Sequence, residues 1–295
     1  MAMRFDPAAP YDVEHEDVVY ARPDGFELLA RVYRPVGAPA GDRPALVDVH
    51  GGTWRYFDRK VDAYYDRALA ACGMVVVALD FRQAPDHRWP SAAEDVAAGV
   101  RWVKRNAAEL GASDGDVGLI GGSSGGHLAL VVALRPGPPE GGVDASVAYA
   151  LGLWPIAAPD WRYRYVLNRL ANPRPSSEPL FDPDRLRRAQ EEFYGDETTM
   201  KSASALRMVE DREFERLPPV WIAHAERDEN VTVEMTERFV DAYRAADGQA
   251  EMVLFPGVGH GFANMGGDAA DHCIEHMVGF IGARLATRPA VSPGE

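Results

Sequence analysis

The sequence predicts an α/β fold: a mostly parallel sheet with helices on both faces. Short, valine-rich apolar runs alternate with segments of helical spacing along most of the chain. The run 74–79 is β-branched and uninterrupted, as is typical of a buried parallel strand. The alternation stops at 154–217, which is rich in arginine, proline and aromatic residues and has no strand pattern. We interpret the chain as one domain, 1–295, with a helical cap inserted at about 154–217.

The N-terminal part contains the first strands and one helix. Two β-runs, 13–20 and 26–34, flank a Pro-Asp-Gly turn and predict an antiparallel hairpin at a sheet edge. A short apolar strand is expected at 45–49. Helical spacing then runs from 60 to 72 and ends at a glycine, just before the valine run.

The middle of the chain continues the alternation. Ser91 and Glu94 have the spacing of a capping box, which predicts a helix that starts there and continues to Gly111. An apolar strand at 117–120 leads into a turn of glycines and serines and then an apolar helix. The next strand is expected at 143–151.

The alternation resumes after the cap. Strands are expected at 220–223 and 252–255, and helices at 232–246 and about 268–286. The tail 287–295 has no core pattern and is predicted to be disordered.

Composition and charge exclude several classes of function. The 295 residues carry a formal net charge of −14, which argues against nucleic acid and anionic membranes as partners. No segment reaches the roughly 18 continuous apolar residues of a membrane span, and the N-terminus lacks a signal-peptide core. The cysteines Cys72 and Cys273 form neither a disulfide framework nor a Cys-x-x-Cys pair. We therefore predict a cytoplasmic protein without nucleic-acid or membrane partners.

Residues 121–126, Gly-Gly-Ser-Ser-Gly-Gly, lie between an apolar strand and an apolar helix. Glycines two residues either side of a serine let strand and helix approach closely and permit a strained turn. The serine at the tip lies at a helix N-terminus, where free N–H groups favour negative charge. The Gly-x-Ser-x-Gly pattern fits with either Ser123 or Ser124 at the tip. A phosphate-binding loop would need a lysine before the serine, and none is present.

This turn resembles the Gly-Asp-Ser-Ala-Gly-Gly signature of the hormone-sensitive-lipase-like branch of the α/β-hydrolases. The resemblance implies that Ser123 is the nucleophile and that Ser124 replaces the small residue after it. Gly122 stands where the family has aspartate. The Asp-Phe-Arg-Gln-Ala-Pro-Asp-His sequence that begins at Asp80 also resembles a family motif, and we expect Asp80 and Arg82 to form a loop-fixing ion pair.

The His-Gly-Gly-Thr-Trp sequence after a predicted strand resembles the family's His-Gly-Gly-Gly oxyanion motif, and this form also occurs in kynurenine formamidases. An oxyanion hole must supply N–H groups where negative charge develops. The resemblance implies that Gly52, Thr53 and Ser124 donate these groups and that Gly51 makes the tight turn. His50 is expected to be structural.

A serine nucleophile needs a base, and the base needs a group that orients it. In this fold the acid and then the histidine follow the serine, each after a strand. His260 lies in a Gly-His-Gly-Phe sequence that closely resembles the family's catalytic histidine loop. Asp228 matches the family's acid, and Glu226 is its competitor.

Aromatic residues near these loops are expected to line the substrate pocket or, equally, to belong to the core. The four candidates are Trp54, Tyr56, Trp154 and Phe262.

A metal site is the remaining chemistry to consider. His272, Glu275 and His276 have helical spacing, and two histidines four residues apart could hold zinc. No third ligand is evident, so we predict a polar helix face and no metal. The strained turn at Ser123 is called the elbow. His127, at the start of the helix that follows the elbow, is expected to be a packed or capping histidine.

The resemblance implies an α/β-hydrolase fold and a serine carboxylic-ester hydrolase. It would act on small to medium acyl or aryl esters through an acyl-enzyme, without a cofactor. The partner is then a small-molecule ester substrate, and a homodimer is left open. One alternative is an amidase or aryl-formamidase with the same triad. Another is a non-catalytic ligand-binding protein, as the plant gibberellin receptors are, which His260 argues against because those receptors lack the catalytic histidine.

Overall fold

The computed structural model describes residues 5–8, 10–38, 43–178 and 181–286, so the predicted disorder of the tail lies outside the described residues. Within these ranges the strands form one eight-stranded sheet in the order β1-β2-β4-β3-β5-β6-β7-β8. The strands from β3 to β8 are parallel to one another, whereas β2 is antiparallel to both β1 and β4. The strands are β1 (Val13–Ala21), β2 (Leu28–Pro35), β3 (Arg43–Val49), β4 (Val75–Leu79), β5 (Ala112–Gly122), β6 (Ala150–Leu153), β7 (Val220–Ala225) and β8 (Ala250–Phe255).

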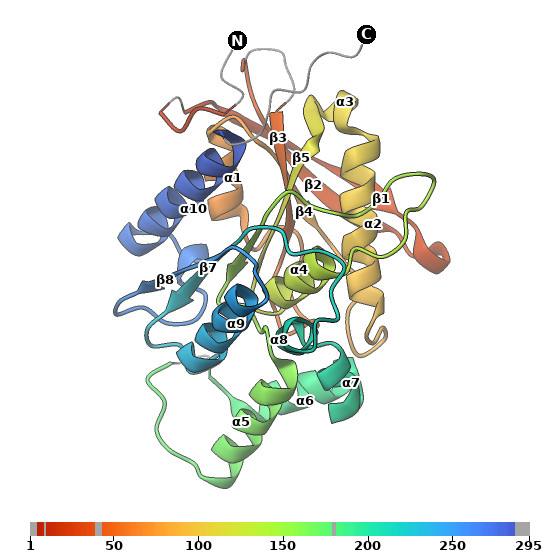
Figure 1. Cartoon of the computed structure of the whole chain (residues 1–295). Helices are drawn as coiled ribbons and strands as arrows, with labels where there is room; N and C mark the ends of the chain where they lie inside the picture. The colour runs from red at the N-terminus through yellow and green to blue at the C-terminus, as the bar shows by residue number, and fades with distance from the viewer. Residues whose placement is uncertain (1–4, 9, 39–42, 179–180, 287–295) are drawn as a thin grey trace.

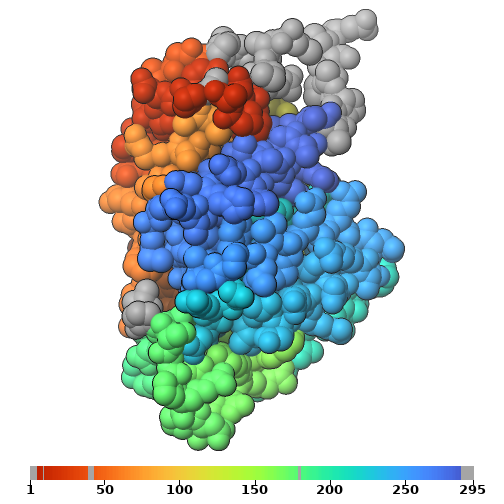
Figure 2. All heavy atoms as spheres, turned by 90° about the vertical axis from the view of Figure 1, so that its left-hand side faces the viewer, coloured from red at the N-terminus to blue at the C-terminus, as the bar shows by residue number. Residues whose placement is uncertain are grey.

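Helices pack on both faces of this sheet (Figure 1). The helices α1 and α10 cover one face, and α10 spreads across it in the view of Figure 2. The helices α2, α4 and α9 cover the other. The helices are α1 (Ala63–Ala71), α2 (Ser91–Arg105), α3 (Ala107–Leu110), α4 (Ser124–Leu134), α5 (Pro159–Ala171), α6 (Pro183–Tyr194), α7 (Glu197–Ser202), α8 (Ala205–Glu210), α9 (Val233–Ala245) and α10 (Asp268–Ala286), with short 3₁₀ turns η1 (Pro23–Gly25) and η2 (Phe262–Asn264).

The apolar core has two layers, because neighbouring residues of a strand point to opposite faces of the sheet. On β3, Val47 packs into the layer of α2 and α4, and Leu46 packs into the layer of α1 and α10. On β4, Val77 and Val76 divide in the same way. Both faces are therefore buried, which is why these strands are continuously apolar.

The stretch between β6 and β7 contains α5 to α8. In Figure 1, α5, α6 and α7 lie at the end of the molecule opposite α3. Three of these helices begin with a side-chain cap: Asp182 accepts the N–H groups of the first turn of α6, Asp196 does so for α7 and Ser204 for α8. Local capping thus defines short helices in a region without a periodic strand pattern.

Three predictions of local structure were wrong. Ser91 is the first residue of α2 and does not cap it, because its hydroxyl donates to the Arg88 carbonyl at 2.6 Å. The predicted continuous helix is interrupted at Asn106, whose side-chain amide donates to the Trp102 carbonyl at 2.7 Å; helix resumes as α3, and its end at Gly111 is as predicted. Of the strand expected at 143–151, only the end forms a strand, as part of β6. Before it, the Asp144 carboxylate accepts the Ser146 N–H, which forms a turn.

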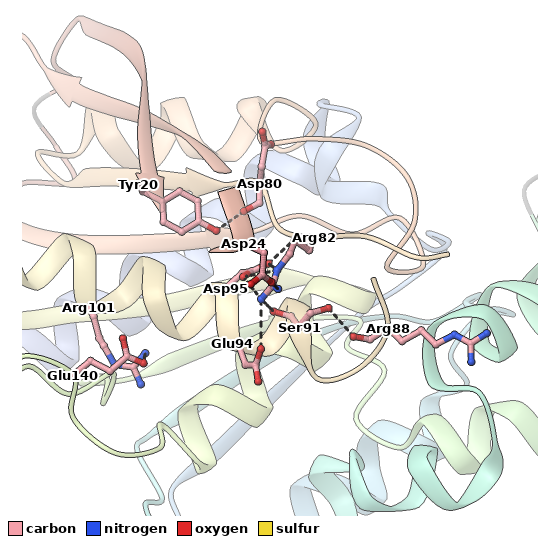
Figure 3. A network of polar contacts seen from close by, with 10 residues as sticks. All are labelled: Tyr20, Asp24, Asp80, Arg82, Arg88, Ser91, Glu94, Asp95, Arg101 and Glu140. Atoms are coloured by element: carbon pink, nitrogen blue, oxygen red, sulfur yellow. Dashed lines mark hydrogen bonds and ion pairs between the residues drawn. The ribbon is translucent and has the colours of Figure 1, made fainter. Parts of the chain in front are cut away.

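The expected ion pair of Asp80 with Arg82 was also wrong. Figure 3 shows Arg82 directed to Asp95, which its guanidinium reaches at 2.8 Å. Asp80 pairs instead with Arg59 at 2.7 Å, and its carbonyl accepts the Tyr20 hydroxyl at 2.6 Å. The loop is indeed fixed by ion pairs, but the partners come from α2 and from the segment before α1.

No helix in the described ranges has both the length and the apolar character needed to cross a bilayer.

Candidate active site

Ser123 lies at the sharp turn between β5 and α4. Its backbone has a φ of +55° and a ψ of −117°, which is strained for any residue but glycine. Flanking glycines make the turn possible. A Cβ on Gly125 would lie 1.9 Å from the Val49 carbonyl oxygen, and one on Gly121 would lie 2.5 Å from the Gly125 carbonyl carbon. The close approach of β3, β5 and α4 therefore requires glycine on both sides of the serine.

Ser123, His260 and Asp228 form one hydrogen-bonded chain at the carboxyl ends of β5, β8 and β7. The Ser123 Oγ lies 2.9 Å from His260 Nε2, and His260 Nδ1 lies 2.7 Å from Asp228 Oδ2. With the imidazole proton on Nδ1, Nε2 is free to accept the serine proton. The Asp228 side chain is fully buried, whereas the imidazole keeps 18% of its surface exposed. The structure therefore brings together side chains that the sequence placed on three separate loops.

Asp228 is held as a carboxylate by donors from its own loop and by His260. Its second oxygen, Oδ1, accepts the N–H groups of Asn230 and Val231, each at 2.8 Å. Burial by itself raises the pKa of Asp228, but the charge and hydrogen bond of His260, with smaller contributions from His224 and the Val231 N–H, lower it below the usual value. Asp228 is thus ionised at neutral pH and positioned to orient the imidazole.

The two adjacent serines have different hydrogen-bond partners. Only the Ser123 hydroxyl, of the two, faces His260. The Ser124 hydroxyl is fully buried and accepts the backbone N–H of Trp54 at 3.2 Å. Ser124 therefore ties the elbow to the loop that follows β3.

That loop has an unusual backbone. Gly52, Thr53 and Trp54 have φ values of +106°, +55° and +57°, a run in the left-handed region. A Cβ on Gly51 would lie 3.1 Å from the Gly122 carbonyl oxygen, so the loop packs tightly on the elbow.

The N–H groups next to Ser123 are available to a ligand. Within the described residues, those of Gly51, Gly52, Thr53 and Ser124 have no acceptor. The Thr53 hydroxyl is buried and likewise has no partner in the described ranges. Such unpaired donors, three from the loop after β3 and that of Ser124 at the N-terminus of α4, suit a group that develops negative charge.

Trp54 anchors this loop to α6 and α4. Its indole stacks on Phe193 of α6 with ring centres 5.0 Å apart, and its Nε1–H donates to His127 Nδ1 at 3.3 Å. His127 in turn donates from Nε2 to the Ala203 carbonyl at 2.8 Å. Burial lowers the pKa of His127 to about 4, so this imidazole is neutral. His127 is thus packed in the core, and it bonds the carbonyl of Ala203, the C-cap residue of α7, as expected of a packed or capping histidine.

The four aromatic candidates occupy different environments. Trp54 is fully buried and packs into the core. Trp154 is also buried, and its ring lies 6.0 Å from that of His260 and 5.0 Å from that of Phe262. Phe262 packs against Phe255 in the core, and Tyr56 is 39% exposed. Of the four, Trp154 is the ring placed directly beside the imidazole.

The remaining polar candidates lie away from this chain of hydrogen bonds. Glu226 is exposed and accepts the Gly257 N–H at 2.8 Å, so Asp228 is the carboxylate at His260. His50 stacks on Phe81 with ring centres 4.4 Å apart, and burial lowers its pKa.

The three residues considered for zinc lie on α10. The Nε2 atoms of His272 and His276 are 3.3 Å apart, and Glu275 faces the other nitrogen of His272. The described residues contain no group of three or more side chains arranged to hold a metal ion.

Two features of the site were not predicted from the sequence. Arg55, in the loop that follows β3, forms an ion pair with Glu192 of α6. Glu178, in the connection between α5 and α6, accepts the backbone N–H of His260 at 2.6 Å. Both are contacts between segments far apart in the chain, and the sequence contains only one indirect signal, the small residue Gly259 beside His260.

The fold and the strained turn at Ser123 are those of a known class of protein. A model of the alpha/beta hydrolase fold family matches residues 46–264, and the chain belongs to that family. Within it, the motifs place the chain in the hormone-sensitive-lipase-like branch, and the predicted fold class is confirmed.

Two curated relatives come from Mycobacterium tuberculosis. Esterase LipC is 30% identical over 85% of this chain and 60% of its own length. The probable carboxylic ester hydrolase LipM is 27% identical over 96% of this chain and 64% of its own length. The chain thus spans less than two thirds of these relatives.

Solved structures of esterase 2 from Thermogutta terrifontis align over nearly all of the chain. The propionate-bound form has a TM-score of 0.73 and 26% identity and covers 97% of this chain and 98% of its own. The form phosphonylated by sarin has a TM-score of 0.75 and 25% identity, with 94% and 97% covered.

Proposed function

We propose that the chain is a serine carboxylic-ester hydrolase that acts on small to medium acyl or aryl esters through an acyl-enzyme. The observation that carries the proposal is the chain from Ser123 through His260 to Asp228, set beside unpaired backbone N–H groups. The esterase relatives and neighbours support the same class of reaction.

In the first half of the reaction, the Ser123 oxygen attacks the carbonyl carbon of the ester. His260 Nε2 takes the hydroxyl proton, and the Asp228 carboxylate stabilises the resulting imidazolium through Nδ1–H. The carbonyl oxygen becomes an oxyanion and accepts hydrogen bonds from the backbone N–H groups of Gly52, Thr53 and Ser124. The bond to the alcohol oxygen then breaks, and His260 returns the proton to the departing alcohol.

In the second half, water hydrolyses the acyl-enzyme. His260 Nε2 removes a proton from the water as its oxygen attacks the acyl carbon, and the same N–H groups stabilise the second oxyanion. The bond to Ser123 breaks, the serine oxygen regains the proton from His260, and the carboxylic acid leaves.

The acyl group is proposed to be short. The neighbouring esterase has been solved with propionate and with butyrate bound. Here the buried ring of Trp154 lies beside His260, which limits the space next to the imidazole. Hydrolysis of nitrophenyl esters from acetate to laurate should peak at or below butyrate. An anilide and formyl-kynurenine should react more slowly, and faster turnover of formyl-kynurenine would favour the amidase class instead.

The doubled serine offers a matched pair of variants. Ser123→Ala should lower kcat by at least about 10⁴. Ser124→Ala keeps the N–H but loses the acceptor of the Trp54 N–H, so its loss should be about tenfold. Mass spectrometry after treatment with an organophosphate should find the adduct on Ser123. An adduct on Ser124 would contradict the assignment.

A further inference from the structure

We infer that Glu178 is a positioning residue. Its carboxylate holds the loop of His260 (the histidine loop) and the loop of Asp228 (the acid loop) in the alignment that catalysis needs. The inference rests on the proposed function, because it concerns the geometry of Ser123, His260 and Asp228. It assigns the connection between α5 and α6 a direct part in that geometry.

The Glu178 carboxylate bridges the two loops through their backbones. Its Oε1 accepts the N–H of His260 at 2.6 Å, and its Oε2 accepts the N–H of Glu229 at 3.0 Å. His260 is the base itself, and Glu229 follows Asp228 directly. A single side chain therefore fixes the backbone at both ends of the 2.7 Å contact between imidazole and acid.

The connection and the acid loop are linked in both directions. While Glu178 accepts from Glu229, the Glu229 carboxylate accepts the Ser177 N–H at 2.8 Å and its hydroxyl at 3.0 Å. The other Glu229 oxygen accepts from Arg169 of α5 at 2.9 Å. These reciprocal bonds keep the Glu178 side chain in place although it is only half-buried.

Gly259 has no side chain that would displace the Glu178 carboxylate from this contact. A Cβ at that position would lie 2.5 Å from Glu178 Oε1, which is closer than real Cβ atoms approach an oxygen. The φ of Gly259 is outside the left-handed region, so backbone conformation does not require glycine here. A Cβ here would displace the end of the Glu178 side chain, and with it the acceptor of the His260 N–H.

The chemistry of the side chain explains why a carboxylate is used. Both backbone groups are donors, and a carboxylate has an acceptor oxygen for each. A glutamine offers one oxygen and one NH₂ group, so it can satisfy only one of the two N–H groups. Because a misplacement of about 1 Å can cost about 10²-fold in rate, loss of this bridge should appear in kcat rather than in substrate binding.

The test is a double-mutant cycle of Glu178→Ala and Gly259→Ala, with Glu178→Gln as the conservative variant. The control is Glu191→Gln, a cap carboxylate that contacts Tyr163 and Arg187 away from the loops. Measured quantities are kcat and KM for nitrophenyl acetate, the rate of organophosphate labelling of Ser123, and Tm. Glu178→Ala should lower kcat and the labelling rate about 30- to 100-fold, with KM within about threefold. Glu178→Gln should lose clearly less.

The cycle also tests the contact itself. Gly259→Ala should impair the wild type strongly but the Glu178→Ala background only slightly, because the clashing oxygen is then absent. Additive losses, or Glu178 variants that match Glu191→Gln in kcat and labelling, would overturn the inference while leaving the esterase proposal intact. A wild-type protein that neither hydrolyses the ester nor is labelled would overturn both.

Discussion

Buried carboxyls at two places in this molecule have pKa values shifted in opposite directions. Asp228 is buried at the site, and its pKa is lowered. Asp48 on β3, Asp62 at the start of α1 and Asp66 on α1 are buried together, and their pKa values are raised, that of Asp62 to about 7. Burial raises the pKa in every case, so burial alone does not explain the difference.

The difference lies in the donors that each carboxyl receives. Asp228 has two backbone N–H groups and His260. In the cluster, Asp48 accepts the Tyr65 hydroxyl at 2.9 Å and Asp62 accepts the Asn264 amide. Neither oxygen of Asp66 has a donor among the described residues. A buried carboxyl thus stays charged only where the fold supplies enough donors, and this protein does so at the site.

The largest expected effect comes from removing the charge at the site. Asp228→Asn keeps an oxygen for the Asn230 and Val231 N–H groups but turns an amide NH₂ toward His260. The imidazole should then adopt the wrong tautomer, and kcat should fall by about 10⁴. Steady-state kinetics on nitrophenyl acetate measures this, with Glu226→Gln as the matched control. A large loss in Glu226→Gln with a nearly normal Asp228→Asn would move the acid to Glu226.

The next effect concerns stability and pH. A carboxyl whose folded pKa is raised contributes stability that is fully present below its unfolded pKa, about 4, and is lost as pH rises through the folded pKa. With Asp62 at about 7, the cluster should make the wild type progressively less stable from about pH 4 to above pH 7.

Asp66→Asn, which removes one of these ionisations, should flatten that decline between pH 5 and pH 9. Denaturant unfolding at several pH values measures the change. Asp184→Asn is the control, since that carboxylate is partly exposed and paired with Arg187 and Arg188 on α6. Parallel curves for Asp66→Asn and wild type would mean that Asp66 is not a protonated buried group.

The smallest effect concerns an unpaired polar group inside the site itself. The Thr53 hydroxyl has no partner in the described ranges, and its side chain lies at the N–H groups that would bind the oxyanion. If its role is steric, Thr53→Val, which keeps the shape, should leave kcat within about threefold. Thr53→Gly should raise the relative rate on a tert-butyl ester while leaving nitrophenyl acetate within about threefold. Equal slowing of every ester by Thr53→Val would show that the hydroxyl stabilises the oxyanion, and the steric explanation would be wrong.

Several features of this protein follow from local sequence alone. The valine run before Asp80 has to be a buried strand, because its residues are apolar on both faces. The glycines around Ser123 predict a turn that other residues would block sterically. The helix α10 matches its predicted bounds because its helical pattern is long. The fold class and the candidate serine and histidine rest on such short-range signals.

Only the tertiary structure decided which groups meet. Arg82 pairs with Asp95 rather than Asp80, and Ser91 bonds a carbonyl instead of capping its helix. The bridge from Glu178 to His260 and the approach of Asp48 to Asp62 and Asp66 join segments that no periodicity relates. The reason is physical: hydrophobic patterns and glycine positions act through neighbours in the chain, whereas a hydrogen bond or a pKa depends on whichever distant groups folding brings within a few ångströms.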